Sequence, residues 1–131
     1  MVKEEKQKFS LCVKAALKKK AFDLIVLDIK EISSFADYFI ICSGNSNRQV
    51  KAIASSIEHD LKRKGVYPLG IEGFSEGKWV LLDYDDIIIH VFYHPIREFY
   101  ELERLWADAP RIALESKSRV KTKKESSKDV R

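Results

Sequence analysis

The segment from Asp37 to Leu61 constrains the fold more than any other part of the chain. DYFIICSG (37–44) is a nearly continuous apolar run of strand length, which is typical of a strand buried on both faces. Ser46 and Gln49 then have the spacing of a capping box, and apolar residues recur at helical intervals: Val50, Ile53, Ala54, Ile57 and Leu61. Gly65 suits the left-handed residue that ends a helix. The pattern predicts a strand followed by a helix over 47–64.

The flanking segments continue this mixture of strands and helices. An amphipathic helix is predicted over 5–20, with one apolar face made by Phe9, Val13, Ala16 and Leu17. Further strands are predicted at 22–29, 66–73, 78–83 and 87–93, and Pro68 favours a sheet edge for the segment that contains it. Pro95 suits the first turn of a last helix, over 96–106. These elements predict a single α/β domain with a mixed sheet of about five strands flanked by helices.

The net charge of +4 is unevenly distributed along the chain. Residues 111–131 contain eight Lys or Arg and three acids, so residues 1–110 carry a net charge of −1. Residues 72–108 are the acidic part, with nine acids and three bases. A nucleic-acid-binding domain is expected to carry its positive charge on the folded body, which argues against that class. We predict a folded domain over 1–110 and a basic, disordered tail over 111–131.

The compartment is indicated by cysteine usage and by the start of the chain. Cys12 and Cys42 form neither a disulfide framework nor a C-x-x-C pair, which favours a reducing environment, with Cys42 a buried free thiol. No apolar run approaches the roughly 18 residues that span a bilayer. The start, MVKEEKQKF, lacks the apolar region of a signal peptide. We therefore expect a cytoplasmic protein.

The acids and histidines of WVLLDYDDIIIHVFYHP (79–95) resemble an active site, but their spacing favours a turn. Asp85 and Asp86 lie between two strand-like runs only a few residues apart, where Asp is a favoured turn residue. His90 and His94 have a metal-binding spacing only on a helix, whereas here they border the end of a strand. We therefore predict a hairpin, and expect neither a metal ion nor a cofactor.

SGNSN (43–47) leads from a strand into a helix, which is the arrangement of an anion-binding loop. A nucleotidyltransferase would also need acids on the following strand to hold magnesium. That strand, VYPLGI, contains no Asp or Glu before Glu72. Catalysis is therefore not expected, and a nucleotidyltransferase-like enzyme that uses the SGNS loop is the alternative function.

Aromatic residues among the acids of 72–108 suggest a docking surface for a basic protein. Trp and Tyr anchors beside carboxylates are what such a surface needs. The opposing interpretation is ordinary core packing, and composition does not decide between the two for Trp79 and Tyr100.

Three blocks of sequence together resemble the ribosomal silencing factor family, also called the Iojap or RsfS family: FADYFIICSGNSNRQVKAIA (35–54), GKWVLLDYDDIIIHVF (77–92) and REFYELERLWADAP (97–110). The resemblance covers residues 8–110. It implies a degenerate nucleotidyltransferase-like fold that lacks the catalytic acids. It also implies a translational repressor that binds the large ribosomal subunit through ribosomal protein uL14, prevents the small subunit from joining and supports large-subunit biogenesis. A homodimer of the free protein is a further implication.

The resemblance also implies which residues bind the partner. The acidic and aromatic signature of the family falls on Glu72, Trp79, Asp83, Asp86, His90, Tyr100, Leu102, Glu103 and Trp106. Ser43 and Gly44 match the strand-to-helix loop of the family. The tail over 111–131 lies outside the shared pattern, and either a peripheral contact with ribosomal RNA or a solvated tail is consistent with its charge.

Overall fold

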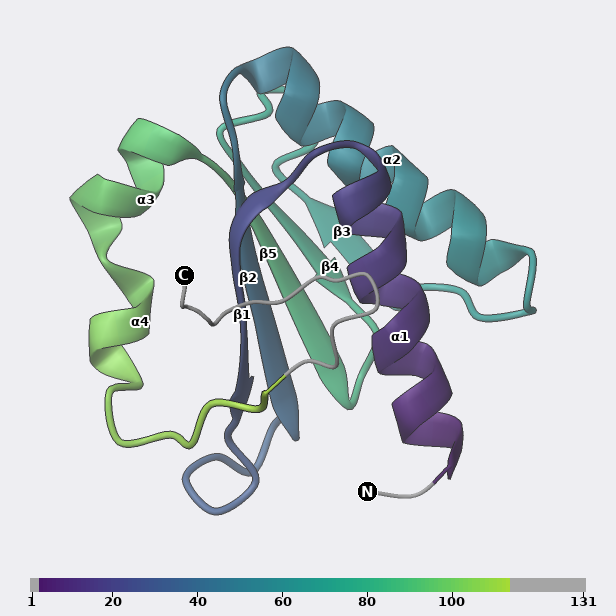
Figure 1. Ribbon diagram of the computed structural model, residues 1–131, viewed down its shortest axis with the longest axis vertical. Helices are drawn as coiled ribbons and strands as arrows, with labels where there is room; N and C mark the ends of the chain where they lie inside the picture. The colour runs from purple at the N-terminus through teal and green to yellow at the C-terminus, as the bar shows by residue number, and fades with distance from the viewer. Residues whose placement is uncertain (1–2, 114–131) are drawn as a thin grey trace.

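A computed structural model describes residues 3–113, with side chains from Gln7 onward, as a five-stranded sheet with helices on both faces (Figure 1). Across the sheet the strands follow the order β1 (Phe22–Asp28), β2 (Tyr38–Gly44), β5 (Ile87–Tyr93), β4 (Trp79–Asp83) and β3 (Gly70–Glu72). β2 and β5 are parallel, and the other neighbouring strands are antiparallel. This architecture confirms the predicted fold class.

The two central strands form the core of the sheet. All seven residues of β2 are buried, and so are the first six of β5. Burial on both faces explains the continuous apolar runs of these strands, because neither face needs polar residues. Cys42 is fully buried with a free thiol, as predicted.

Helices α1 (Lys3–Lys18) and α2 (Asn47–Lys62) cover one face of the sheet (Figure 1). The α2 cap forms at the predicted place: the Ser46 hydroxyl accepts a hydrogen bond from the Gln49 backbone N–H at 3.0 Å. The Gln49 side chain accepts from the Asn45 N–H rather than closing the capping box on Ser46. After the helix ends, Gly65 has a φ of +79°, which confirms its predicted left-handed conformation.

The buried stripe of α1 differs from its predicted face. Phe9, Cys12, Ala15 and Ala16 are buried, whereas Leu17 is 36% exposed. A stripe of small side chains lets α1 lie close to α2. Across that contact the Ser56 hydroxyl donates a hydrogen bond to the Ala15 backbone carbonyl at 2.9 Å.

Two short helices, α3 (His94–Tyr100) and α4 (Leu102–Leu105), lie on the opposite face. The prediction of a single helix over 96–106 is therefore wrong. The observed helix begins earlier, at His94, and is interrupted at Glu101, which has a left-handed conformation with φ 50° and ψ 50°. α3 packs against β5 and β2. The side chains that β4 and β3 place on this face consequently stay partly exposed.

β4 and β5 form the predicted hairpin. The Asp83 carboxylate accepts from the Asp85 N–H at 2.9 Å, and Asp85 has a φ of 74°. An aspartate turn of this kind gives Asp83 and Asp85 a structural role in the hairpin. β3 occupies a sheet edge, which confirms the position favoured by Pro68.

The chain returns to the sheet after α4 and runs beside β1. The Asp28 N–H donates to the Pro110 carbonyl at 2.8 Å, and the Ile112 N–H donates to the Val26 carbonyl at 2.9 Å. The packed chain thus extends two residues past the predicted domain boundary at 110. Residues 114–131, which make up most of the predicted tail, lie outside the described residues.

Candidate protein-docking surface

The part of the α3–α4 face that no described helix covers brings several of the predicted binding residues together. Along β4, Trp79, Leu81 and Asp83 are half-buried and alternate with the buried residues of the opposite face. Glu72 of β3 lies opposite Leu81 in the sheet and is exposed. Together with Tyr100 at the end of α3, these residues form what we call the Trp79–Tyr100 face: Glu72, Trp79, Leu81, Asp83 and Tyr100.

Trp79 is held in place from several sides. Its indole N–H donates to His90 Nδ1 at 3.1 Å, and its ring lies 4.8 Å from the ring of Phe92. The ring of Tyr100 lies 5.2 Å from that of Trp79, while Tyr100 itself is 53% exposed. Trp79 therefore packs against the core on one side and forms an aromatic pair with the exposed Tyr100 on the other.

His90 supports this pair from below. It is 4% exposed, and burial lowers its pKa to about 4, so the imidazole is neutral at pH 7. Because Nδ1 accepts the Trp79 N–H, the ring proton lies on Nε2, which has no hydrogen-bond partner among the described residues. The structure thus gives His90 a role in orienting Trp79.

Asp86 lies apart from this face. Its carboxylate pairs with Lys8 of α1 at 2.7 Å, and α1 covers the other side of the sheet. Its backbone carbonyl accepts from the N–H groups of Asp37 and Tyr38. Asp86 therefore joins the hairpin to α1, and the turn between β4 and β5 directs it away from Asp83.

The three predicted residues beyond Tyr100 are packed or paired. Leu102, the first residue of α4, is only 9% exposed and belongs to the hydrophobic core. The ring of Trp106 lies 5.1 Å from that of Phe39. Glu103 pairs with Arg97 at 2.9 Å. Burial alone would raise the pKa of Glu103, but hydrogen bonds from its own backbone N–H and from Arg97, with the charges of Arg97 and Arg111, hold that pKa below its ordinary value.

The strand-to-helix loop serves structural contacts. The buried Ser43 hydroxyl accepts from Arg97 Nη1 at 2.8 Å. At Gly44 an added Cβ would lie 3.2 Å from a Val50 methyl group, so the strand can approach α2 closely. The Asn47 amide donates to the carbonyls of Glu76 and Gly77, both at 3.1 Å. The side chains of Ser43 and Asn47 thus tie this loop to neighbouring segments.

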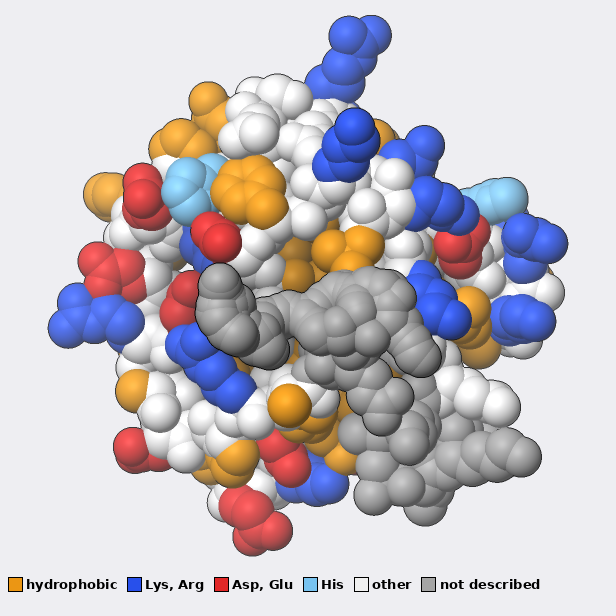
Figure 2. Space-filling model, in the orientation of Figure 1, with side chains coloured by type: hydrophobic (Ala, Val, Ile, Leu, Met, Phe, Trp, Pro, Cys, Tyr) orange, Lys and Arg blue, Asp and Glu red, His pale blue; other side chains and the backbone are white. Residues whose placement is uncertain are grey.

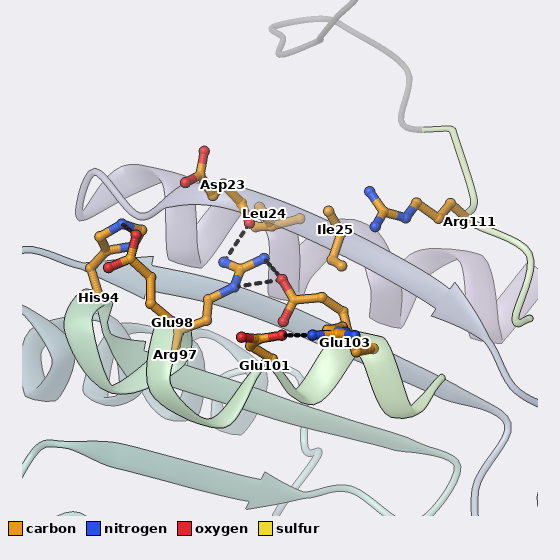
Figure 3. A pocket seen from close by; sticks show the side chains of 10 residues that line it. Asp23, Leu24, Ile25, His94, Arg97, Glu98, Glu101, Glu103 and Arg111 are labelled. Atoms are coloured by element: carbon orange, nitrogen blue, oxygen red, sulfur yellow. Dashed lines mark hydrogen bonds and ion pairs between the residues drawn. The ribbon is translucent and has the colours of Figure 1, made fainter. Parts of the chain in front are cut away.

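Sequence reasoning missed Arg97, which is 7% exposed and bonded to three segments of the chain. Nothing in REFYELER distinguishes a buried arginine from a surface one. Arg97 also lines a pocket of about 470 Å³ between β1 and the α3–α4 segment (Figure 3). The lining of this pocket includes no residue of the Trp79–Tyr100 face.

Charge is distributed unevenly over the molecule. Figure 2 shows most of the visible acidic side chains on the α3–α4 side and basic side chains gathered over the α1–α2 side.

Within residues 3–113, no group of three or more His, Cys, Asp or Glu could hold a metal ion. The described helices include none long and apolar enough to cross a membrane.

Comparison with known proteins agrees with the resemblance in sequence. The model of the family described as "Ribosomal silencing factor during starvation" matches residues 2–131. The ribosomal silencing factor RsfS of Bacillus subtilis is 48% identical over 92 residues, which cover 70% of this chain and 78% of the relative. The mouse protein named "Mitochondrial assembly of ribosomal large subunit protein 1" is 33% identical over 90 residues, covering 66% of this chain and 39% of that protein.

A solved structure agrees with the fold. The crystal structure of a Bacillus halodurans protein superimposes with a TM-score of 0.75 at 38% identity, covering 83% of this chain and 99% of that one. The family model spans every strand and helix of the described domain. The chain therefore belongs to the ribosomal silencing factor family.

Proposed function

We propose that this protein binds the large ribosomal subunit through ribosomal protein uL14 and prevents the small subunit from joining, which represses translation without catalysis. Membership in the ribosomal silencing factor family supports a regulatory role on the ribosome. The single observation that supports docking most strongly is the aromatic pair of Trp79 and Tyr100, which lies beside carboxylates on a part of the sheet that no described helix covers.

The chemistry of this face suits a basic protein. Large aromatic side chains supply apolar contact area at little cost in conformational entropy, and they dominate binding when a partner excludes water from them. Glu72 and Asp83 lie at the rim, where charge complementarity guides the encounter and selects the partner. Supporting residues below the surface, His90 among them, keep the aromatic pair in place before the partner arrives.

Repression would follow from occupancy alone. A folded domain seated on the surface where two subunits meet excludes the second subunit sterically and needs neither a cofactor nor a reaction. The name of the mouse relative refers to assembly of the mitochondrial large subunit. By analogy, we extend the proposal to a role in large-subunit biogenesis.

Replacing Trp79 by Ala is expected to weaken binding to the large subunit by about 2 kcal/mol or more, roughly 30-fold in Kd, because the substitution removes a central aromatic anchor. Cosedimentation with purified large subunits over a concentration series measures the change. Tyr67→Ala is the matched control, since Tyr67 is 62% exposed but lies outside the Trp79–Tyr100 face. Unchanged cosedimentation of a folded Trp79→Ala protein would remove this residue from the interface.

Truncation after Leu114 keeps all the described residues, including the pairing of Ile112 with Val26. We expect the truncated protein to bind the large subunit within about threefold of the full chain at 150 mM salt, and to lose part of the salt dependence if the tail touches RNA. Binding isotherms at two salt concentrations test this. If large-subunit binding disappears with the tail, docking through the folded face is the wrong mechanism.

A further inference from the structure

The break between α3 and α4 is unusual for this sequence. Residues 96–106 have the composition of one uninterrupted helix, with neither Gly nor Pro inside it. The break instead occurs at Glu101, whose left-handed conformation is unfavourable for an L-residue with a side chain of this size. Another part of the structure must therefore stabilise the interruption.

Arg97 provides the contacts that hold the break. Its Nη1 donates to the Asp23 carbonyl at 2.7 Å and to the Ser43 hydroxyl at 2.8 Å, which fixes it to β1 and β2. Its Nε donates to Glu103 Oε2 at 3.0 Å, and its Nη2 lies 2.9 Å from the same oxygen. Figure 3 shows the guanidinium between the strand and the α3–α4 segment. One buried side chain thus joins both sides of the break to the sheet.

The pair of Arg97 and Glu103 cannot form in a continuous helix. Residues six positions apart are rotated by roughly 240° around a helix axis, so their side chains point in different directions. The left-handed residue at Glu101 turns α4 back, and this brings the carboxylate of Glu103 to the guanidinium. Formation of the ion pair and interruption of the helix are therefore coupled.

Tyr100 is the last residue of α3, directly before the break, and its ring lies 5.2 Å from that of Trp79. We propose that Arg97 is a positioning residue: by stabilising the broken helix, it places Tyr100 against Trp79 and completes the docking face. Its contribution to partner affinity rests on the proposed function, whereas its effect on the aromatic pair does not.

The test compares Arg97→Lys, Glu101→Gly and the double variant. Lysine keeps the charge but cannot donate to Asp23, Ser43 and Glu103 together. Glycine adopts the left-handed conformation without penalty, so it favours the break independently of Arg97. Arg104→Lys is the control, because Arg104 is an exposed arginine that pairs only with Glu101 among the described residues.

Two measurements are made on each variant: the chemical shift of the Trp79 indole N–H, which senses the nearby Tyr100 ring, and the affinity for purified uL14. We expect Arg97→Lys to move the indole resonance toward its position in Tyr100→Ala and to weaken binding about tenfold. Glu101→Gly alone and Arg104→Lys should leave both unchanged. The double variant should regain the wild-type resonance and bind within about threefold of wild type, a rescue that general destabilisation does not predict.

Failure of rescue in a folded double variant would overturn the proposal, as would a wild-type indole resonance in Arg97→Lys. If Arg97→Lys does not fold, Ser43→Ala replaces it, since it removes one acceptor of Arg97 and keeps the ion pair; the same shift and the same rescue by Glu101→Gly are then required. If wild-type protein does not bind uL14 while the indole shift and its rescue occur, the docking proposal fails and the positioning role of Arg97 stands.

Discussion

Replacing Gly73 by Ala is expected to destabilise the protein by about 3 kcal/mol, a large loss for one methyl group. Gly73 has a φ of +80°, and a Cβ there would lie 2.1 Å from the Trp79 carbonyl oxygen. The left-handed conformation alone costs an alanine about 1 kcal/mol. The remainder comes from the clash, because a strand carbonyl can move only if the β3–β4 connection opens. Urea denaturation measures the change through its midpoint.

Gly65 provides a matched control for this substitution. It has nearly the same backbone conformation, with φ +79°, but nothing lies within 4 Å of the position of its Cβ. Gly65→Ala should therefore cost only about 1 kcal/mol, the conformational part of the penalty. Equal costs at the two glycines would mean that the Trp79 backbone yields easily. In that case the β3–β4 connection, which contains Gly73, does not fix the backbone at Trp79.

The second large effect is a dependence of stability on pH that arises from His90. Its pKa is about 4 in the folded protein, against 6.5 for an ordinary histidine, because burial disfavours the imidazolium. Between these values the unfolded chain binds a proton that the folded protein excludes. The stabilisation is therefore complete above pH 6.5 and is lost as pH falls toward 4, by about 3 kcal/mol in total.

Comparison with His90→Gln isolates this contribution from that of the carboxylates. Glutamine can still accept a hydrogen bond from the Trp79 indole but does not titrate, so carboxylates such as Glu103 contribute equally to both proteins. Urea denaturation at several pH values gives the free energy of unfolding of each protein. The wild-type value minus the variant value should decrease continuously from pH 7 to pH 4, by about 3 kcal/mol in total. A constant difference across this range would contradict a buried neutral His90.

Much of the fold follows from local signals in the sequence. The cap at Ser46 and the glycine at 65 mark the ends of α2 because each satisfies a backbone requirement that few other residues meet. The apolar run of β2 predicts its central place, and the aspartates at 83–86 predict the hairpin. These features depend on residues close together in the chain, which is why the sequence alone reveals them.

The missed features depend on residues far apart in the chain. The break at Glu101 is stabilised by contacts of Arg97 with β1 and β2, so no local pattern marks it. Asp86 differs from Asp83 in its surroundings because it pairs with Lys8, which is 78 residues away in sequence. Cross-strand register gathers Glu72 and Leu81 beside Trp79 and Tyr100, and register is a property of the assembled sheet. The residue types of the candidate surface could thus be predicted, but not which of them lie together.

The pairing of residues 110–112 with β1 has a consequence for the behaviour of the protein in a crowded cell. Exposed strand edges recruit other chains by backbone pairing and so promote aggregation. Here one edge of the sheet is partly occupied by the returning chain, and the other is a strand of only three residues that follows Pro68. While residues 110–112 occupy the Val26–Asp28 part of the β1 edge, a nascent polypeptide or a second copy cannot pair with the backbone there.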